Sequence, residues 1–148
     1  MMNVTTTLTE TGVKDFVINW YRQLDVHAPL TDLLPRLIPE GLVMRLPETT
    51  LHGIPDFIKW YEGVTHRFFD EAHEMKELHV HISDNQAEVN LIVNWQAHIW
   101  NAPAPNSQWI GFDATQSWIV KVSPETNQMI VTTYNVDKFV PMPGSPDL

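Results

Sequence analysis

The chain has 148 residues, no cysteine, 9 lysine and arginine residues against 18 acidic residues, and a formal net charge of −9. An acidic surface without a basic run repels nucleic-acid phosphates and anionic lipids, so we predict no nucleic-acid partner and no membrane partner. The missing cysteines exclude disulfides, thiolate nucleophiles and thiolate metal sites. With 43% apolar residues, a domain of this size can form a core without such staples.

The domain organisation is predicted to be simple. One domain covers residues 1–148, with irregular tails at 1–9 and 141–148 and no internal repeat. The first dozen residues, MMNVTTTLTETG, lack the basic flank and the apolar stretch of a signal peptide, so we expect a cytoplasmic protein.

Two amphipathic helices are predicted in the first half of the chain. Residues 10–25 carry an apolar stripe with helical spacing, and a threonine just before it can cap the helix. A second helix opens at Ile54-Pro55-Asp56, because proline suits the first helical position and an acidic side chain suits the positive end of the helix dipole. Between them, residues 29–39 form only short turns, since a proline interrupts them, and residues 41–46 indicate a short strand.

From Leu78 onward, apolar and polar residues alternate with the period of a β-strand. Two such runs, beginning at Leu78 and Ala87, flank a two-residue turn at Asp84-Asn85. In the register that this turn sets, apolar residues pair with apolar ones and His81 faces Glu88. The two runs are therefore predicted to form a β-hairpin.

Two more strands are expected, over 110–122 and 130–136. The inner face of the last one is predicted to carry Ile130, Thr132, Tyr134 and Val136. An order of helix, turns, short strand, helix and long antiparallel strands is typical of an α+β fold in which helices cover one face of a curved sheet.

With this order of elements, the chain resembles the nuclear transport factor 2-like superfamily, and within it the SnoaL-like branch. The resemblance covers Val13 to Val140 and rests on the stretches FVINWYRQL (16–24), LVMRLPETTLHG (42–53), FIKWY (57–61) and IVTTYNVD (130–137). It implies a cystatin-like, cone-shaped roll, in which a curved antiparallel sheet wraps around two long helices and its open end holds a pocket for a small apolar ligand. It also implies frequent homodimers, and functions that range from isomerases, dehydratases and cyclases to non-catalytic binders.

One activity of that superfamily is not expected here. Ketosteroid isomerases resemble this chain, but they use one acidic residue on the first short strand and another on a late strand. The corresponding stretches are Val43-Met44-Arg45-Leu46 and Thr115-Gln116-Ser117-Trp118, which hold no carboxylate.

Aromatic and polar side chains on the predicted inner faces indicate an apolar cavity with a few polar groups, the usual composition of a ligand site. The set predicted to line this pocket is Trp20, Met44, Trp60, Trp95, Gln116, Trp118, Thr132 and Tyr134, although each of these residues alone is compatible with ordinary core packing. If the pocket is catalytic, we expect Gln116 and Tyr134 to hold a ligand oxygen and His52 to transfer a proton. No cofactor is expected.

Three functions remain open from the sequence. The first expectation is a SnoaL-like domain that binds a small apolar molecule in an aromatic pocket, because apolar walls suffice for binding. The alternative is a cofactor-free enzyme of isomerase, dehydratase or cyclase type, acting on a small apolar carbonyl compound. The third is a structural dimerisation module with a filled core.

The outer face of the sheet is predicted to pair two copies of the chain as a homodimer. Interfaces are rich in aromatic residues and poor in charge, and this face carries Ile92, Trp100, Trp109 and Ile119. A solvated sheet with stray apolar residues is the alternative. The histidines on this face predict no metal site: with His98 opposite position 71, His79 lies about 27 Å away at ~3.4 Å per residue.

Overall fold

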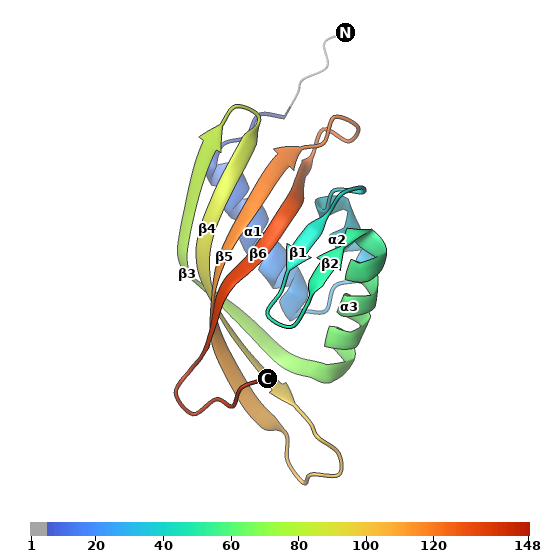
Figure 1. The fold of residues 1–148 in the computed structure, drawn as a ribbon, viewed down its shortest axis with the longest axis vertical. Helices are drawn as coiled ribbons and strands as arrows, with labels where there is room; N and C mark the ends of the chain where they lie inside the picture. Colours follow the sequence, from blue (N-terminus) through green and yellow to red (C-terminus); the bar gives the residue numbers. More distant parts are fainter. Residues whose placement is uncertain (1–5) are drawn as a thin grey trace.

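The computed structural model describes residues 6–148 and confirms the expected α+β architecture (Figure 1). The elements in chain order are α1 (Glu10–Asp25), α2 (Leu30–Leu33), the 3-10 turn η1 (Leu34–Arg36), β1 (Val43–Arg45), β2 (Thr50–His52), α3 (Gly53–Arg67), β3 (Phe68–Ser83), β4 (Gln86–Ile99), β5 (Gln108–Val122) and β6 (Met129–Pro141). The strands form one six-stranded sheet in the order β2-β1-β6-β5-β4-β3. Neighbouring strands are antiparallel except β1 and β6, which run parallel.

The two long helices lie on the concave side of this sheet (Figure 1). Helix α1 has the predicted bounds, and the Thr9 hydroxyl caps it by accepting a 3.0 Å hydrogen bond from the Gly12 backbone N–H. Helix α3 begins one residue before the predicted start. There the Asp56 carboxylate accepts a 2.8 Å hydrogen bond from the His52 backbone N–H, as in a capping box.

The predicted hairpin between β3 and β4 is confirmed residue by residue. Ile82 pairs with Ala87, and His81 pairs with Glu88, on either side of the Asp84-Asn85 turn. The predicted inner-face residues also point inward. Leu91, Val93, Trp118 and Tyr134 are buried, whereas Leu78, Val80 and Trp95 are half-buried and pack against the core.

Strand β3 is longer than the apolar pattern indicates, because it begins at Phe68, directly after α3. One bulge lies between Phe69 and Ala72 and a second between Met75 and Glu77. These extra residues also shift the register, so His98 faces Phe69 and not position 71. The short strand β2 has no counterpart among the predicted elements.

A bulge in β6 corrects part of its predicted inner face. Val131 pairs with the buried Val120, while Thr132 has no partner across the ladder. Its hydroxyl donates a 3.4 Å hydrogen bond to the Ile119 carbonyl oxygen. The extra residue reverses the alternation of side chains before Thr133. Val131 therefore faces inward, whereas the prediction had Ile130 and Thr132 on the inner face.

The convex face carries the apolar residues predicted for it. Ile92, Trp109 and Ile119 are half-buried there, and Trp100, just past the end of β4, is 56% exposed. Asn94 lies on the same face but is buried, because the side chain of Met142 covers it. Within residues 6–148, no helix has the length and apolar character needed to cross a membrane.

Phe57 is predicted to be the anchor that holds α3 on the core. Its ring is fully buried, with its centroid 5.9 Å from that of Trp20 and 5.8 Å from that of Tyr61. We expect Phe57→Ala to lower the free energy of unfolding by about 3–5 kcal/mol, as measured by equilibrium chemical denaturation. Val26→Ala is the control, because Val26 is 75% exposed and should change stability by less than about 0.5 kcal/mol. Equal losses in the two variants would contradict this assignment.

Candidate functional site

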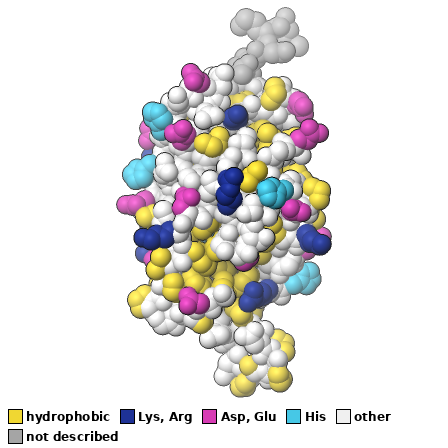
Figure 2. All heavy atoms as spheres, viewed as in Figure 1, with side chains coloured by type: hydrophobic (Ala, Val, Ile, Leu, Met, Phe, Trp, Pro, Cys, Tyr) yellow, Lys and Arg dark blue, Asp and Glu magenta, His cyan; other side chains and the backbone are white. Residues whose placement is uncertain are grey.

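A cavity of about 500 Å³ lies between the sheet and the two long helices. Its walls are mostly apolar and include Val64, Phe68, Val93, Trp95, Ala114, Val136 and Phe139. It borders two separate clusters of the core, since Val93 belongs to the larger one and Phe68 to the smaller one. On the face drawn in Figure 2, hydrophobic side chains gather in the lower half of the molecule, above the hairpin that joins β4 and β5.

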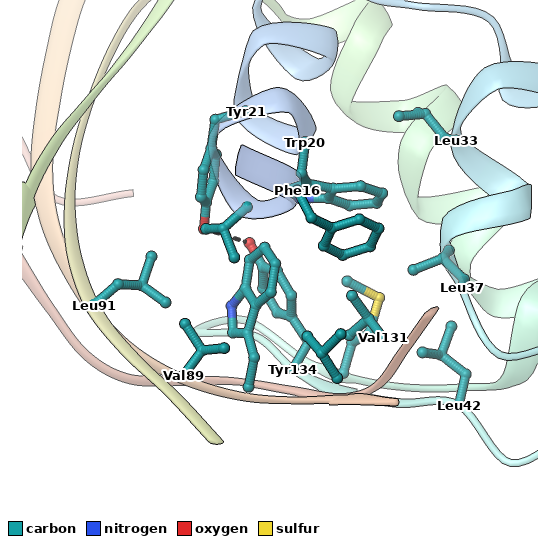
Figure 3. Close-up of a cluster of buried hydrophobic side chains, with 14 of the residues drawn as sticks. Phe16, Trp20, Tyr21, Leu33, Leu37, Leu42, Val89, Leu91, Val131 and Tyr134 are labelled. Atoms are coloured by element: carbon teal, nitrogen blue, oxygen red, sulfur yellow. Dashed lines mark hydrogen bonds between the residues drawn. The ribbon is translucent and has the colours of Figure 1, made fainter. Parts of the chain in front are cut away.

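Half of the residues predicted to line the pocket do line this cavity, namely Trp60, Trp95, Gln116 and Tyr134. Trp20, Met44 and Trp118 do not, because each is 1% exposed within the packed core. Figure 3 shows Trp20 among the side chains of this core. The bulge in β6 accounts for the absence of Thr132 from the lining.

The structure places His52 outside the cavity. It is the last residue of β2 and the residue before α3, where its side chain is exposed and is not among the lining residues. The short strand β2 holds it there by pairing with Val43. The expected route for proton transfer through His52 therefore does not fit the geometry.

A buried hydrogen-bond network surrounds the predicted ligand-oxygen site. The Gln116 side-chain oxygen Oε1 accepts a 2.9 Å hydrogen bond from the Tyr21 hydroxyl and a 3.0 Å hydrogen bond from Trp118 Nε1. An indole N–H can only donate, so this contact fixes which end of the Gln116 amide is oxygen. The Gln116 side chain also interacts with the Tyr134 hydroxyl, and Gln116 is among the residues that line the cavity.

The two tyrosines of this network form a chain of hydrogen bonds that ends at Gln116. Tyr21 donates its only hydroxyl proton to Gln116, so in the 3.1 Å contact between Tyr21 and Tyr134 the proton comes from Tyr134 (dashed line in Figure 3). Burial raises the pKa of Tyr134 to about 12 and raises the pKa of Tyr21 well above its usual value of 10.0. Both hydroxyls therefore stay protonated near neutral pH.

A histidine that the sequence analysis did not select lies in the same cavity. Nδ1 of His73 is 2.5 Å from Oδ1 of Asp25, and the His73 backbone N–H donates to Oδ2 of the same carboxylate at 3.3 Å. An ionised carboxylate only accepts, so Nδ1 carries the proton and Nε2 is left as a proton acceptor. The Tyr21 ring packs on the imidazole, with 4.8 Å between centroids, so His73 and Gln116 both contact the same tyrosine side chain, one at its ring and the other at its hydroxyl.

A second acid–base pair lies two residues earlier on β3. The Glu71 carboxylate lines the cavity with a side chain that is only 5% exposed. One of its oxygens accepts a 3.0 Å hydrogen bond from Trp95 Nε1, and the other is hydrogen-bonded to His27 Nε2. Glu71 is therefore fully engaged by protein donors, unlike Nε2 of His73.

The alternation of apolar and polar residues did not reveal Glu71 and His73, because the bulge between Met75 and Glu77 exchanges the two faces of β3. Extending the alternation back from Leu78 assigns even-numbered residues to the inner face, whereas the structure has Glu71, His73 and Met75 there. The one available signal was the spacing of three between the apolar residues Met75 and Leu78, which indicates a bulge.

Comparisons by sequence match no family model and no curated protein. Solved structures match in fold. A proposed dehydratase of the nuclear transport factor 2-like family from Streptomyces avermitilis gives a TM-score of 0.72 at 12% identity, over 89% of this chain and 95% of that chain. A nuclear transport factor 2-like superfamily protein from Salmonella enterica serovar Typhimurium gives 0.70 at 12% identity, over 89% of both chains. A protein of unknown function with a cystatin-like fold from Nostoc punctiforme gives 0.69 at 11% identity, over 97% of this chain and 100% of that chain.

These neighbours share the layout described above, with a curved sheet around helices, and they confirm the fold that the resemblance implied. The chain has the nuclear transport factor 2-like, cystatin-like fold. Identities this low show the fold alone, because proteins that share a fold can differ in function.

The buried tyrosines predict a loss of stability in alkali. A tyrosine whose folded pKa is raised stabilises the folded state fully below its unfolded pKa of 10.0, and this contribution is lost as pH rises toward the folded value. With a folded pKa of about 12, Tyr134 accounts for roughly 3 kcal/mol between pH 10 and 12. We expect Tyr134→Phe to show a shallower fall in the free energy of unfolding over that range, measured by denaturant titrations at stepped pH. Parallel curves for the two proteins would contradict it.

Proposed function

We propose that the protein binds a small, mostly apolar carbonyl compound and catalyses proton transfer at the carbon next to the carbonyl, without a cofactor. The observation that carries this proposal is His73 Nε2, a proton acceptor on an apolar cavity that has no hydrogen-bond partner within residues 6–148. The same cavity contains Gln116, whose side-chain amide can donate to a ligand oxygen.

Binding follows from the walls of the cavity. A ligand with one or two rings would bury its apolar surface against Val93, Trp95 and Phe139, at roughly 25 cal/mol per Å² removed from water. The side-chain amide of Gln116 would then orient the carbonyl oxygen of the ligand, since a cavity with a few placed polar groups selects a ligand's orientation.

The proposed chemistry is an enolisation. His73 Nε2 takes the proton from the carbon next to the carbonyl, the C–H electron pair forms the new C=C bond, and the carbonyl π electrons move to oxygen. Gln116 donates to that oxygen as it becomes negative, and Asp25 stabilises the imidazolium that forms at His73. Return of the same proton to another carbon gives an isomer; its delivery to a hydroxyl group one carbon further on releases water.

The expected rate gain suits an easy proton transfer. A placed general base contributes roughly 10²–10⁴ in rate and one oxyanion donor roughly 10²–10³. These gains are sufficient for an activated ketone and too small for the hydrolysis of a stable bond. The Streptomyces structure named a proposed dehydratase has the same fold, which supports an elimination that begins with this step.

Proton exchange on a simple ketone tests this proposal. We expect the protein in D₂O to accelerate the exchange of deuterium into the carbon next to the carbonyl of 2-tetralone, followed by proton NMR. His73→Gln should lower this rate by about 10²–10⁴, because it removes the base but keeps a polar side chain of similar size. Asp25→Asn should lower it less, because the imidazole keeps its place but loses its charged partner.

Two histidines outside the cavity provide the controls. His66→Gln and His52→Ala should exchange at the parent rate, since His66 is exposed on α3 and bonded to its own helix at Glu62, and His52 does not line the cavity. If 2-tetralone binds but exchanges no faster than in buffer, the protein is a non-catalytic binder and the catalytic proposal fails.

We also propose that two copies pair through the convex face of the sheet, around Ile92, Trp100, Trp109 and Ile119. The support for this is an exposed tryptophan and three half-buried apolar residues on an otherwise polar surface. Ile92→Asp should give a folded monomer in light scattering combined with circular dichroism. A dimer of unchanged strength would place the contact elsewhere.

A further inference from the structure

The edge of the cavity formed by α3 carries two cations that form no ion pair within the described residues. Lys59 and Arg67 both line the cavity. Within residues 6–148, neither has a carboxylate oxygen within 4.0 Å of its side-chain nitrogens. This chain has only 9 lysine and arginine residues against 18 acidic ones. Two cations without an ion-pair partner on the same cavity are therefore unexpected.

The residue between these cations is a glycine. Lys59, Gly63 and Arg67 are four residues apart in turn, so they form one ridge of α3, about 12 Å long at 1.5 Å per residue. Gly63 also lines the cavity. The long side chains of its two neighbours can therefore converge on the open space above it.

Neither the backbone nor the packing within residues 6–148 requires a glycine at position 63. It lies inside a regular helix and is not among the glycines with positive φ, and a Cβ added to it would meet no atom within 4 Å. Glycine is among the least favourable residues in a helix interior, so an alanine here would stabilise α3. The space beside Gly63 at the cavity edge is therefore open, and a larger side chain at this position would enter it.

The carboxylates on the cavity are already engaged. Glu71 is hydrogen-bonded to His27 and Trp95, and Glu48 accepts a 2.9 Å hydrogen bond from Trp60 Nε1. Arg67 is held beside the cavity by its own neighbour, with its guanidinium carbon 5.2 Å from the centroid of the Phe68 ring. Both carboxylates keep their charge, but each is held by these hydrogen bonds, and within residues 6–148 neither forms an ion pair with Lys59 or Arg67.

We propose that the ligand of this site is an amphipathic acid: its apolar body fills the cavity, and its carboxylate sits over Gly63 between Lys59 and Arg67. This rests on the proposed function and narrows its substrate to a cyclic carbonyl compound that also carries an anionic group. Charge-assisted hydrogen bonds from two cations at the cavity edge select an anion over a neutral compound of the same shape.

A pair of fluorescent probes of nearly equal shape tests the proposal. 8-Anilinonaphthalene-1-sulfonate is an apolar aromatic anion, and N-phenyl-1-naphthylamine is its neutral counterpart. We expect the parent protein to bind both, and the double variant Lys59→Gln/Arg67→Gln to lose about tenfold in affinity for the anion, with the neutral probe within twofold. Lys121→Gln, at the far end of β5, should leave both affinities unchanged.

A second variant avoids any loss of fold. Gly63→Glu puts a carboxylate between the two cations at helical spacing of four, which should raise the melting temperature and occupy the anion seat. Its matched control, Gly63→Gln, has the same size without the charge. Gly63→Glu should bind the anion about tenfold more weakly than Gly63→Gln, while the neutral probe distinguishes the two by less than twofold.

The outcomes separate this inference from the proposed function. Equal affinities of Gly63→Glu and Gly63→Gln for the anionic probe, or equal losses for both probes in the double variant, would overturn the anion seat alone. If the neutral probe fails to bind the parent protein, the cavity does not take apolar molecules, and the proposed function and the anion seat fail together.

Discussion

The alternation of side chains along β3, and the two bulges that interrupt it, decide what the cavity contains. Successive side chains of a strand point to opposite faces, so each extra residue exchanges the two faces from that point on. The bulge beyond Met75 allows Leu78 to face the core at one end of the strand and His73 to face the cavity at the other. A regular strand in the Leu78 register would turn Ala72 and Glu74 inward, and the cavity would lose its base.

The C-terminal end of α1 fixes the side chains that these bulges turn inward. Asp25, the last residue of the helix, holds His73, and His27, two residues further on, holds Glu71. His27 has a φ of 49°, a left-handed conformation that is costly for a residue with a side chain, and such strain persists where surrounding contacts determine it. Removing one member of either pair would leave a buried polar group without its partner, which costs more than the pair itself contributes.

The fold was predictable from the sequence where a repeating pattern reports burial. The apolar stripe of α1, the paired runs of the β3–β4 hairpin and the alternation of β5 each bury one face, and their predicted bounds or registers hold. Of the candidate site, Gln116 was recognisable because it is a polar residue in an otherwise apolar alternation. His73 was not, because its burial depends on a bulge and its partner Asp25 lies 48 residues away in the chain. His52 was misplaced for a related reason. The segment before α3 contains the short strand β2, which pairs His52 with Val43 and holds it outside the cavity.

The distribution of polar groups argues against a core that is merely unfilled. Around Trp20 and Trp118 the same two helices and sheet pack with side chains 1% exposed, so this sequence can close its interior where closure is favoured. Toward the other end it keeps about 500 Å³ open and places Gln116 and His73 on the cavity wall, the latter with an Nε2 that has no hydrogen-bond partner within residues 6–148. Filling that volume with leucine or phenylalanine would bury more apolar surface and avoid the cost of desolvating Asp25 and Glu71, so the folded state would be more stable without these groups. Polar groups retained at the expense of stability are typical of functional sites, and here Glu71, His73 and Gln116 all line the cavity.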